Sequence, residues 1–204
     1  MIKFKLPTRK PSENPARPKG WLANFSVIAG AILLALIITL FVFQSYRVDG
    51  ESMENTLQNN DRLVIDKIPR TWSRITGHAY IPHRGDIIVF NEVGTFNSPS
   101  PESKQLIKRV IGLPGDRVVI SGGQITIYNA ANPSGFNPDM SGWSLADTNS
   151  PGDIDITLGP TQLFVSGDNR TNSTDSHIFG PIDASQIIGK LVLRLAPFSQ
   201  RHVF

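Results

Sequence analysis

The sequence contains no cysteine among its 204 residues. This absence excludes a disulfide-stapled scaffold, a zinc or iron–sulfur site with cysteine ligands, and a thiol nucleophile. Charged residues are also sparse, at 18%, beside 40% hydrophobic residues, a balance that does not fit a fully disordered protein. The length suits one domain with appendages and is sufficient to bury a core.

Basic charge is concentrated at the N-terminus. The formal net charge is +3, but residues 1–19 hold six Lys or Arg residues and one acid, whereas the rest of the chain holds 14 bases and 16 acids. A slightly acidic folded part does not favour nucleic-acid binding, so we expect no nucleic-acid partner. We interpret residues 1–19, which include four prolines, as a disordered basic tail.

A long uncharged stretch follows the tail. No charged residue occurs from Gly20 to Tyr46, and Val27–Phe43 has Thr39 as its one polar side chain. As a helix that rises about 1.5 Å per residue, this stretch can cross a hydrocarbon core of roughly 30 Å. A cleaved signal peptide is the alternative, but the run is long for one and no small-residue cleavage site follows it. The sequence therefore predicts a transmembrane signal-anchor helix over residues 20–46.

The charges that flank this stretch predict its orientation. Six bases precede it and only Arg47 follows closely, so the positive-inside rule places the N-terminus in the cytoplasm. We therefore expect a single-pass protein of the plasma membrane, in contact with membrane lipid. Residues 47–204 would form an extracytoplasmic domain.

Short apolar runs between Gly, Pro, Asn and Asp residues make up the remainder of the chain. They predict strands at Arg62–Ile68, Asp86–Phe90, Leu106–Ile111, Arg117–Ser121, Gln124–Tyr128, Leu163–Val165 and Ile187–Leu195. No long segment with a helical period appears there, so residues 47–204 are predicted to be mostly β. Residues 130–160, dominated by Asn, Pro, Ser, Gly and Asp, are predicted to be a loop-rich insertion.

Two residues and one polar segment are candidates for chemistry. Ser52 taken alone is typical of a turn, and Glu54 breaks the G-x-S-x-G pattern of a nucleophile elbow. Lys108 is more informative, because it lies within the apolar run Leu106–Ile111, where burial would lower its pKa. A lysine on an edge strand that reaches water is the alternative. The segment Gly167–His177 is dense in polar residues and is either part of a site or a solvated turn.

Four ordered blocks that include these residues resemble the motif set of type I signal peptidases. The blocks are Ser52-Met53-x-x-Thr56-Leu57, Arg84–Phe90, Lys108–Asp116 and Gly167–Ser176. The resemblance runs from the uncharged stretch to Gly180, and four blocks in order are far more specific than any one of them. It implies a mostly antiparallel, barrel-like β catalytic domain with one N-terminal transmembrane helix.

The resemblance also implies a Ser/Lys dyad, with Ser52 as nucleophile and Lys108 as general base. The backbone N–H of Ser52 would donate to the oxyanion, Ser173 would orient the lysine amine, and Asp175 would support that loop. A lysine accepts a proton only when it is neutral, so its pKa must fall by roughly two to three units from about 10.4. Apolar neighbours of Lys108 in the sequence can supply that shift.

Three positions depart from the family's pattern. Gly50 stands where some members have a serine whose hydroxyl is a second oxyanion donor, so that donor is absent. Asn55 stands where the family usually has proline, and His177 where it usually has arginine. The last two departures remove no chemical group that bond cleavage needs.

The implied function is removal of N-terminal signal peptides from exported preproteins, by cleavage after small residues in an A-x-A arrangement. The expected substrate-binding residues are Val48, Gly50, Met53, Leu57, Leu106 and Ile107. No metal and no cofactor is implied. The implied partners are signal peptides, membrane lipid and, transiently, the secretion translocon.

Two alternatives remain at this stage. One is a hydrolase of the Ser/His type, which would use one of the histidines His78, His83, His177 and His202. The other is a catalytically impaired family member that acts as a membrane-anchored binding module. The first leaves Lys108 and its block unexplained, and the second leaves the joint presence of Ser52, Lys108 and Ser173 unexplained.

Overall fold

The computed structural model describes residues 19–92, 104–197 and 201–204. The chain divides into two units, Met1–Ile37 and Ile38–Phe204. The predicted basic tail lies outside the described residues, except for Lys19.

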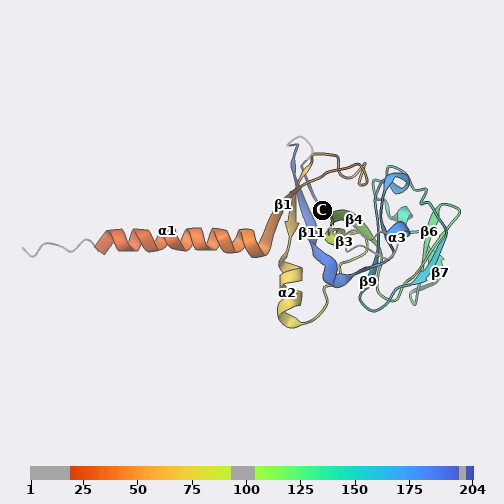
Figure 1. The fold of residues 1–204 in the computed structure, drawn as a ribbon, viewed down its shortest axis with the longest axis horizontal. Coiled ribbons are helices and arrows are strands. Elements are labelled where there is room, and N and C mark those ends of the chain that lie inside the picture. The colour runs from red at the N-terminus through yellow and green to blue at the C-terminus, as the bar shows by residue number, and fades with distance from the viewer. Residues whose placement is uncertain (1–18, 93–103, 198–200) are drawn as a thin grey trace, which may run out of the picture. The chain divides into compact units, whose positions relative to one another are not determined.

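Helix α1, Lys19–Ile37, is the described part of the first unit (Figure 1). Large apolar side chains are exposed along it, among them Val27 at 71% and Leu33 at 60%. Within residues 19–92, 104–197 and 201–204, no helix reaches both the length and the apolar character that membrane crossing demands.

The second unit begins with a π-helical turn, η1, Ile38–Val42, and continues as strand β1, Phe43–Arg47. The helix predicted over residues 20–46 therefore ends before Phe43. The physical reason is pairing, because all five residues of β1 form an antiparallel ladder with strand β2, Arg62–Asp66. Such tertiary pairing overrides the weak local preference of a few residues for helix.

The larger of two sheets carries the candidate catalytic residues. Within the described residues it holds eight antiparallel strands in the order β1-β2-β11-β3-β4-β9-β10, with β12 paired to β11. The remaining bounds are β3 Ile87–Glu92, β4 Lys104–Gly112, β9 Gln162–Ser166, β10 Ile182–Asp183, β11 Ile187–Ala196 and β12 His202–Val203.

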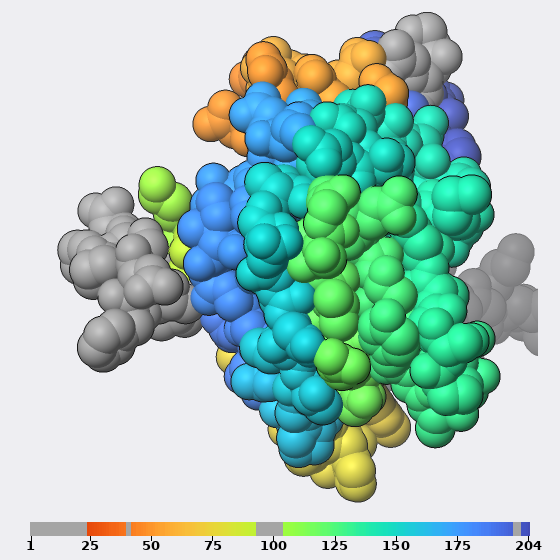
Figure 2. Space-filling model, turned by 90° about the vertical axis from the view of Figure 1, so that its right-hand side faces the viewer, coloured from red at the N-terminus to blue at the C-terminus, as the bar shows by residue number. Residues whose placement is uncertain are grey.

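The smaller sheet has four antiparallel strands among the described residues, in the order β7-β6-β5-β8. Their bounds are β5 Arg117–Ser121, β6 Gln124–Asn129, β7 Asn132–Phe136 and β8 Ile154–Thr157. Figure 2 shows the surface of this part of the molecule, coloured green to cyan. The prediction of a mostly antiparallel β domain is confirmed.

Seven strands predicted from the sequence are present, and their ends differ from the prediction by at most two residues. The segment 130–160 differs from the prediction of a loop-rich insertion, because it contains β7, the 3₁₀ turn η2 (Pro138–Ser141) and β8. β7 is mostly polar and leaves no apolar pattern in the sequence, whereas β8 alternates apolar and polar residues over only four positions, too few to stand out.

Short helices connect the strands. They are α2 Ile68–Thr76, α3 Ser176–Phe179, η3 Arg170–Asn172 and η4 Ala184–Gln186. The sequence did not predict α2. It has Pro69 in its first turn and is capped after Thr76 by Gly77, whose φ is 73°. Its nine residues are too few to produce a recognisable helical period.

One buried apolar cluster underlies the site and fixes the segment after β1 to the larger sheet. Its members are Val48, Met53, Leu57, Leu63, Ile65, Ile87, Val89, Ile188 and Leu191. Three of these lie within ten residues of one another around Ser52. Full burial of each such side chain stabilises the fold by about 1.5–3 kcal/mol. The candidate nucleophile is therefore carried by a loop that the core holds in place.

Candidate active site

Ser52 lies in the loop that follows β1, which we call the serine loop (residues 48–61). At its base, the Val48 N–H donates to the carbonyl oxygen of Asp61 at 2.9 Å. At its tip, the carbonyl oxygen of Ser52 accepts a hydrogen bond from the Asn169 N–H at 3.0 Å. The first hydrogen bond joins the two ends of the serine loop, and the second attaches the backbone of Ser52 to the loop after β9.

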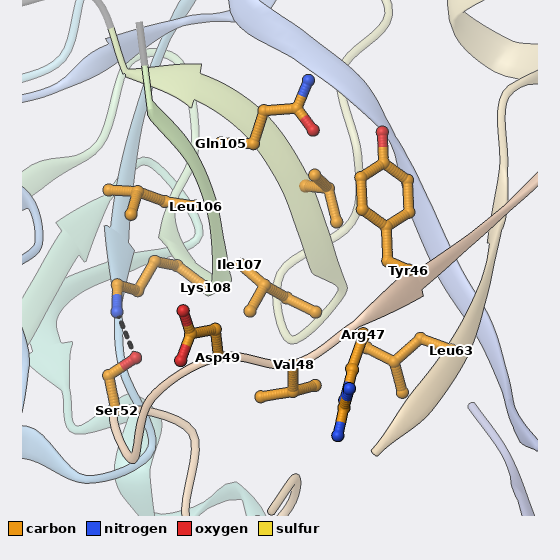
Figure 3. Close-up of a pocket in the computed structure, with 11 residues that line it drawn as sticks. Tyr46, Arg47, Val48, Asp49, Ser52, Leu63, Gln105, Leu106, Ile107 and Lys108 are labelled. Carbon is orange, nitrogen blue, oxygen red and sulfur yellow. Dashed lines mark hydrogen bonds between the residues drawn. The ribbon is translucent and has the colours of Figure 1, made fainter. Parts of the chain in front are cut away.

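Lys108 approaches Ser52 from β4, near the middle of the larger sheet. It is paired in register with Ile88 of β3, and its side chain is only 3% exposed. Its Nζ donates to the Oγ of Ser52 at 2.5 Å, as the dashed line in Figure 3 shows. The structure therefore brings together the two residues that the sequence predicted as nucleophile and base, although they are 56 residues apart.

Burial changes the ionisation of Lys108. It lowers the pKa of the Lys108 amine from 10.5 to about 8, because a charged amine loses hydration there, while the negative charges of Asp175 and Asp168 partly oppose the shift. A neutral amine can accept a proton from a serine hydroxyl, whereas an ammonium group cannot. At neutral to mildly alkaline pH, a useful fraction of Lys108 is therefore able to act as a base.

Asp175 organises the loop beside the dyad. Its Oδ2 accepts hydrogen bonds from the Ser166 hydroxyl and the Gly167 N–H, both at 2.9 Å. Its Oδ1 faces His177, whose backbone N–H and ring Nδ1 lie at 3.2 and 2.7 Å. Burial by itself would raise the pKa of Asp175, but hydrogen bonds, first that of the His177 side chain, outweigh burial and lower it. His177 therefore contacts this carboxylate through two nitrogen atoms, despite the departure from arginine.

Ser173 and Gly167 meet close to the backbone of Ser52. A β-carbon on Gly167 would overlap both the Ser173 hydroxyl and the Ser52 carbonyl oxygen, so the loop requires glycine there. Ser173 is buried and helps to lower the pKa of Asp175, but among the described residues its Oγ has no partner at full hydrogen-bond geometry. The predicted hydrogen bond from Ser173 to the lysine amine is therefore absent, because the side chain faces Gly167 and Asp175.

A buried ion pair lies next to the dyad. The Arg109 guanidinium donates to both carboxylate oxygens of Asp168, at 2.8 and 2.5 Å, and to the carbonyl oxygen of Gly85 at 2.8 Å. The Thr56 hydroxyl of the serine loop donates to Asp168 at 2.5 Å. The guanidinium carbon lies 5.1 Å from the ring centre of Trp143. These contacts connect β4, the serine loop and the loop after β9.

Arg109 and Asp168 were not predicted as site residues, although both lie within the motif blocks. A signal was present: Lys108 and Arg109 are consecutive in a strand, so their side chains point to opposite faces of the sheet. Two adjacent basic residues in an apolar central strand therefore place a charge on each buried face. Each of these buried charges then requires a polar or oppositely charged partner of its own.

A cavity of about 120 Å³ opens beside the dyad. It is lined by Tyr46, Arg47, Val48, Asp49, Ser52, Leu63, Val89, Gln105, Leu106, Ile107 and Lys108, drawn in Figure 3. A second and more open hollow, about 430 Å³, includes Gly50, Leu106 and the dyad. Four of the predicted substrate-binding residues, Val48, Gly50, Leu106 and Ile107, thus line these cavities.

The positions of Met53 and Leu57 differ from those expected of substrate-binding residues. Both are fully buried in the apolar cluster under the serine loop, with 1% and 0% of their surface exposed. The turn in which the Leu57 N–H donates to the Met53 carbonyl at 2.7 Å directs both residues inward. Their apolar character therefore serves to hold the loop.

The histidines do not form the arrangement of a Ser/His hydrolase. Within the described part of the chain, the hydrogen-bond partner of the Ser52 hydroxyl is Lys108 and not a histidine. His78 contacts the carbonyl oxygen of Thr76 at 3.0 Å, and His177 contacts Asp175. His202 stacks edge to face on Phe204.

Comparison with known proteins places this site in a family. A model of the family described as signal peptidase, peptidase S26, matches residues 21–196. A signal peptidase I from Leptolyngbya laminosa is 32% identical over 195 residues, which cover 95% of this chain and 89% of that protein. A signal peptidase I from Bacillus amyloliquefaciens is 34% identical over 179 residues, covering 83% and 85% of the two chains.

A solved signal peptidase I from Enterococcus faecalis V583 is also similar, with 28% sequence identity and a TM-score of 0.38. The match covers 54% of this chain and 97% of that one. The assignment depends on the family model and on the sequence relatives.

The class of the protein follows from these findings: it is an enzyme, a serine endopeptidase. More particularly, the chain belongs to the signal peptidase family, peptidase S26. The resemblance carried by the four sequence blocks is thereby confirmed.

Proposed function

We propose that this chain removes N-terminal signal peptides from exported preproteins, with Ser52 as nucleophile and Lys108 as general base. The observation that carries the proposal is the 2.5 Å contact between the Ser52 hydroxyl and an amine that is almost fully buried. Burial keeps that amine partly neutral, with a pKa of about 8. The family relatives named signal peptidase I support the choice of substrate.

In the proposed reaction, neutral Lys108 takes the proton from Ser52 as Oγ forms a bond to the scissile carbonyl carbon. The backbone N–H of Ser52 stabilises the negative charge on the carbonyl oxygen by donating a hydrogen bond to it. Gly50 has no side chain that could be a second donor. The lysine ammonium then gives its proton to the leaving amine, and the acyl-enzyme remains. Water, activated by the same amine, releases the signal peptide and restores Ser52.

The pH dependence follows from the direction of the lysine shift. Protonated Lys108 is inactive, so kcat/KM should rise about tenfold per pH unit below neutrality and level off above an apparent pKa near 8. Because the charge of Asp175 raises the pKa of Lys108, folded Asp175→Asn should move the midpoint to lower pH. A pH–rate profile of both proteins on one peptide substrate measures this. A flat profile from pH 6 to pH 9 would contradict the lysine base.

The substrate is proposed to bind as an extended strand. β4 pairs with β9 only from Arg109 onward, so one edge of Lys104–Lys108 has no strand beside it among the described residues. The cavity lies between this edge and the end of β1, and it includes both Ile107 and Val48. A peptide added at a sheet edge gains main-chain hydrogen bonds and places alternate side chains on one face.

Small side chains should therefore be required at the first and third positions before the cut. A cavity of about 120 Å³ shared by two alternate side chains has little room beyond alanine. Replacing either alanine of a model preprotein peptide by leucine or lysine should lower kcat/KM by about 10²-fold or more. The second position before the cut provides the control, since its side chain points the other way. Equal cleavage after alanine and after lysine would exclude this binding mode.

Membrane anchoring is part of the same proposal. The uncharged stretch from Gly20 to Tyr46 and the exposed apolar side chains of α1 support a single-pass anchor. The excess of bases before this stretch supports a cytoplasmic N-terminus and an extracytoplasmic catalytic domain at the plasma membrane. An anchored enzyme would meet its substrates as they emerge beside membrane lipid and the secretion translocon.

A further inference from the structure

Residues 143–147, which we call the strap, extend along two loops beside the dyad. They belong to the segment 130–160, to which neither the motif blocks nor the proposed reaction gives a role. Trp143, Leu145 and Asp147 are partly buried, whereas the residues between them are exposed. Such alternation is that of an extended chain with one side turned inward. The strap therefore lies with one side against the body of the enzyme.

The backbone of the strap pairs with the loop after β9. The N–H of Ala146 donates to the carbonyl oxygen of Asp168 at 3.0 Å, and Asp147 forms a parallel β-bridge with Asn169. Asn169 is the residue whose own N–H donates to the carbonyl oxygen of Ser52. A single residue therefore separates the strap from the backbone of the candidate nucleophile.

The strap also contacts the serine loop directly. The Nδ2 of Asn55 donates to the carbonyl oxygen of Leu145 at 3.4 Å, and the carbonyl oxygen of Ser144 lies 3.3 Å from the Thr56 hydroxyl. Asn55 is one of the three departures from the family's pattern, and a proline has no side-chain group that could donate this hydrogen bond. The departure at Asn55 therefore gives this chain an additional contact between the serine loop and the strap.

Trp143, the first residue of the strap, covers the buried ion pair beside the dyad. Its ring centre lies 5.1 Å from the guanidinium carbon of Arg109, within the range of a cation–π interaction. The ring is so close to Gly85 that a β-carbon there would approach it to 3.2 Å. Arg109 and its partner Asp168 are both buried. Because opposite charges attract more strongly where water is excluded, the ring supports the pair that joins β4 to the serine loop.

The chain is fixed on both sides of the strap. Before it, Asp139 of η2 forms a buried ion pair with Arg170 at 2.8 Å, and the Nε of Arg170 donates to the carbonyl oxygen of Gly167 at 2.8 Å. After it, the N–H of Ser150 donates to the carbonyl oxygen of Gly123, in the turn between β5 and β6, at 2.8 Å. The strap is therefore attached to the loop after β9 and to the smaller sheet, and it can resist movement of the loops that it contacts.

We propose that the strap is a positioning element for the dyad and that Trp143 is its main positioning residue. By stacking on Arg109 and pairing with the loop after β9, it holds the Ser52 hydroxyl in line with the Lys108 amine. This inference rests on the proposed Ser/Lys reaction. It also gives the smaller sheet a part in the activity, because the strap is fixed to that sheet.

Replacing Trp143 by alanine should lower kcat about tenfold or more, since a misplacement of about 1 Å between reacting groups costs roughly 10²-fold. KM should change by less than about twofold, because Trp143 lines neither cavity beside the dyad. Tyr128→Ala is the matched control. Tyr128 of β6 stacks in the same way, at 5.4 Å, on Arg117, whose ion-pair partner is the exposed Asp155. The control should keep the parent's kcat, measured for the full-length enzyme in detergent micelles on one signal-peptide substrate.

Two further variants separate the role of the ring from folding. Trp143→Phe keeps an aromatic face over Arg109 and should restore at least about half of the parent's kcat, whereas Trp143→Leu keeps apolar bulk alone and should not. Unfolding midpoints are measured for every variant, and kcat is compared at a temperature at which all are folded. Equal kcat for the leucine and phenylalanine variants would refute the stacking role of the ring. An equal loss of kcat in Tyr128→Ala would refute the positioning role of the strap.

A second substrate separates this inference from the proposed function. Hydrolysis of 4-nitrophenyl acetate, corrected for the rate of Ser52→Ala, requires the dyad but no recognition of a signal peptide. If the parent hydrolyses this ester and not the signal-peptide substrate, the proposed function fails, but Trp143→Ala should still slow ester hydrolysis about tenfold. A folded Trp143→Ala enzyme with the parent's rates on both substrates would overturn the positioning role and leave the proposed function standing.

Discussion

Replacing Lys108 by arginine should abolish peptide cleavage, with kcat/KM reduced at least about 10³-fold. The substitution keeps a long side chain and a positive charge, but a guanidinium group does not lose its proton in a protein and cannot act as a base. Ser52→Ala, which removes the attacking oxygen, should be equally inactive. The measurement is kcat/KM for one signal-peptide substrate, with circular dichroism to confirm the fold.

Two further variants show whether the loss comes from the chemistry. Lys190→Arg is the matched control, because Lys190 contacts Asp86 at 2.8 Å and arginine can keep this ion pair. It should retain nearly full activity. Lys108→Met should be inactive yet unfold at a midpoint no lower than that of the parent at pH 7, because burial disfavours the charged amine in the folded state. Substantial turnover by Lys108→Arg would disprove the Ser/Lys mechanism.

The sequence predicted the dyad through motif identity and not through spatial reasoning. Ser52 and Lys108 are 56 residues apart, and no local pattern shows that they meet. The meeting depends on two tertiary features: the position of β4 between β3 and β9, and the attachment of the Ser52 carbonyl to Asn169. The strands themselves could be predicted, because the apolar alternation of a strand is a local pattern in the sequence. Which strands lie side by side in the sheet could not be predicted, because that depends on contacts between distant residues.

The orientations of Met53, Leu57 and Ser173 could not be predicted from the sequence, and the physical reason is common to all three. Met53 and Leu57 follow the nucleophile and are apolar, a property that a substrate pocket and a core share. Only the direction of the turn decides between the two roles, and here it turns both residues into the core. Similarly, Ser173 is close to the dyad, but its hydroxyl faces Asp175 and Gly167. A sequence motif identifies the residue and does not specify the direction in which its hydroxyl points.

The second large effect is expected at the ion pair beside the dyad. Asp168 is fully buried, and its carboxylate receives two hydrogen bonds from Arg109 and one from Thr56. Asp168→Ala would leave the Arg109 guanidinium buried without its counter-charge. Breaking a buried pair on one side costs about 3–5 kcal/mol, which is a large share of the stability of an ordinary domain. The midpoint of denaturant unfolding should therefore fall steeply with an unchanged slope.

An exposed pair of the same geometry provides the control for Asp168→Ala. Arg117 also donates to both oxygens of a carboxylate, that of Asp155, at 2.7 and 2.5 Å, but both side chains are about half exposed. Because water replaces the lost partner there, Asp155→Ala should hardly move the midpoint. Arg109→Leu combined with Asp168→Ala should recover part of the stability lost by Asp168→Ala alone, since no unpaired charge then remains buried.

The double variant also separates stability from catalysis. Asp168 joins β4, which carries Lys108, to the serine loop through Thr56, and the next residue, Asn169, holds the Ser52 carbonyl. A refolded double variant should therefore remain well below the parent in kcat/KM, since an error of about 1 Å between nucleophile and base costs roughly 10²-fold. Equal unfolding midpoints for Asp168→Ala and Asp155→Ala would show that this ion pair does not support the fold, and full activity of the double variant would show that it does not position the dyad.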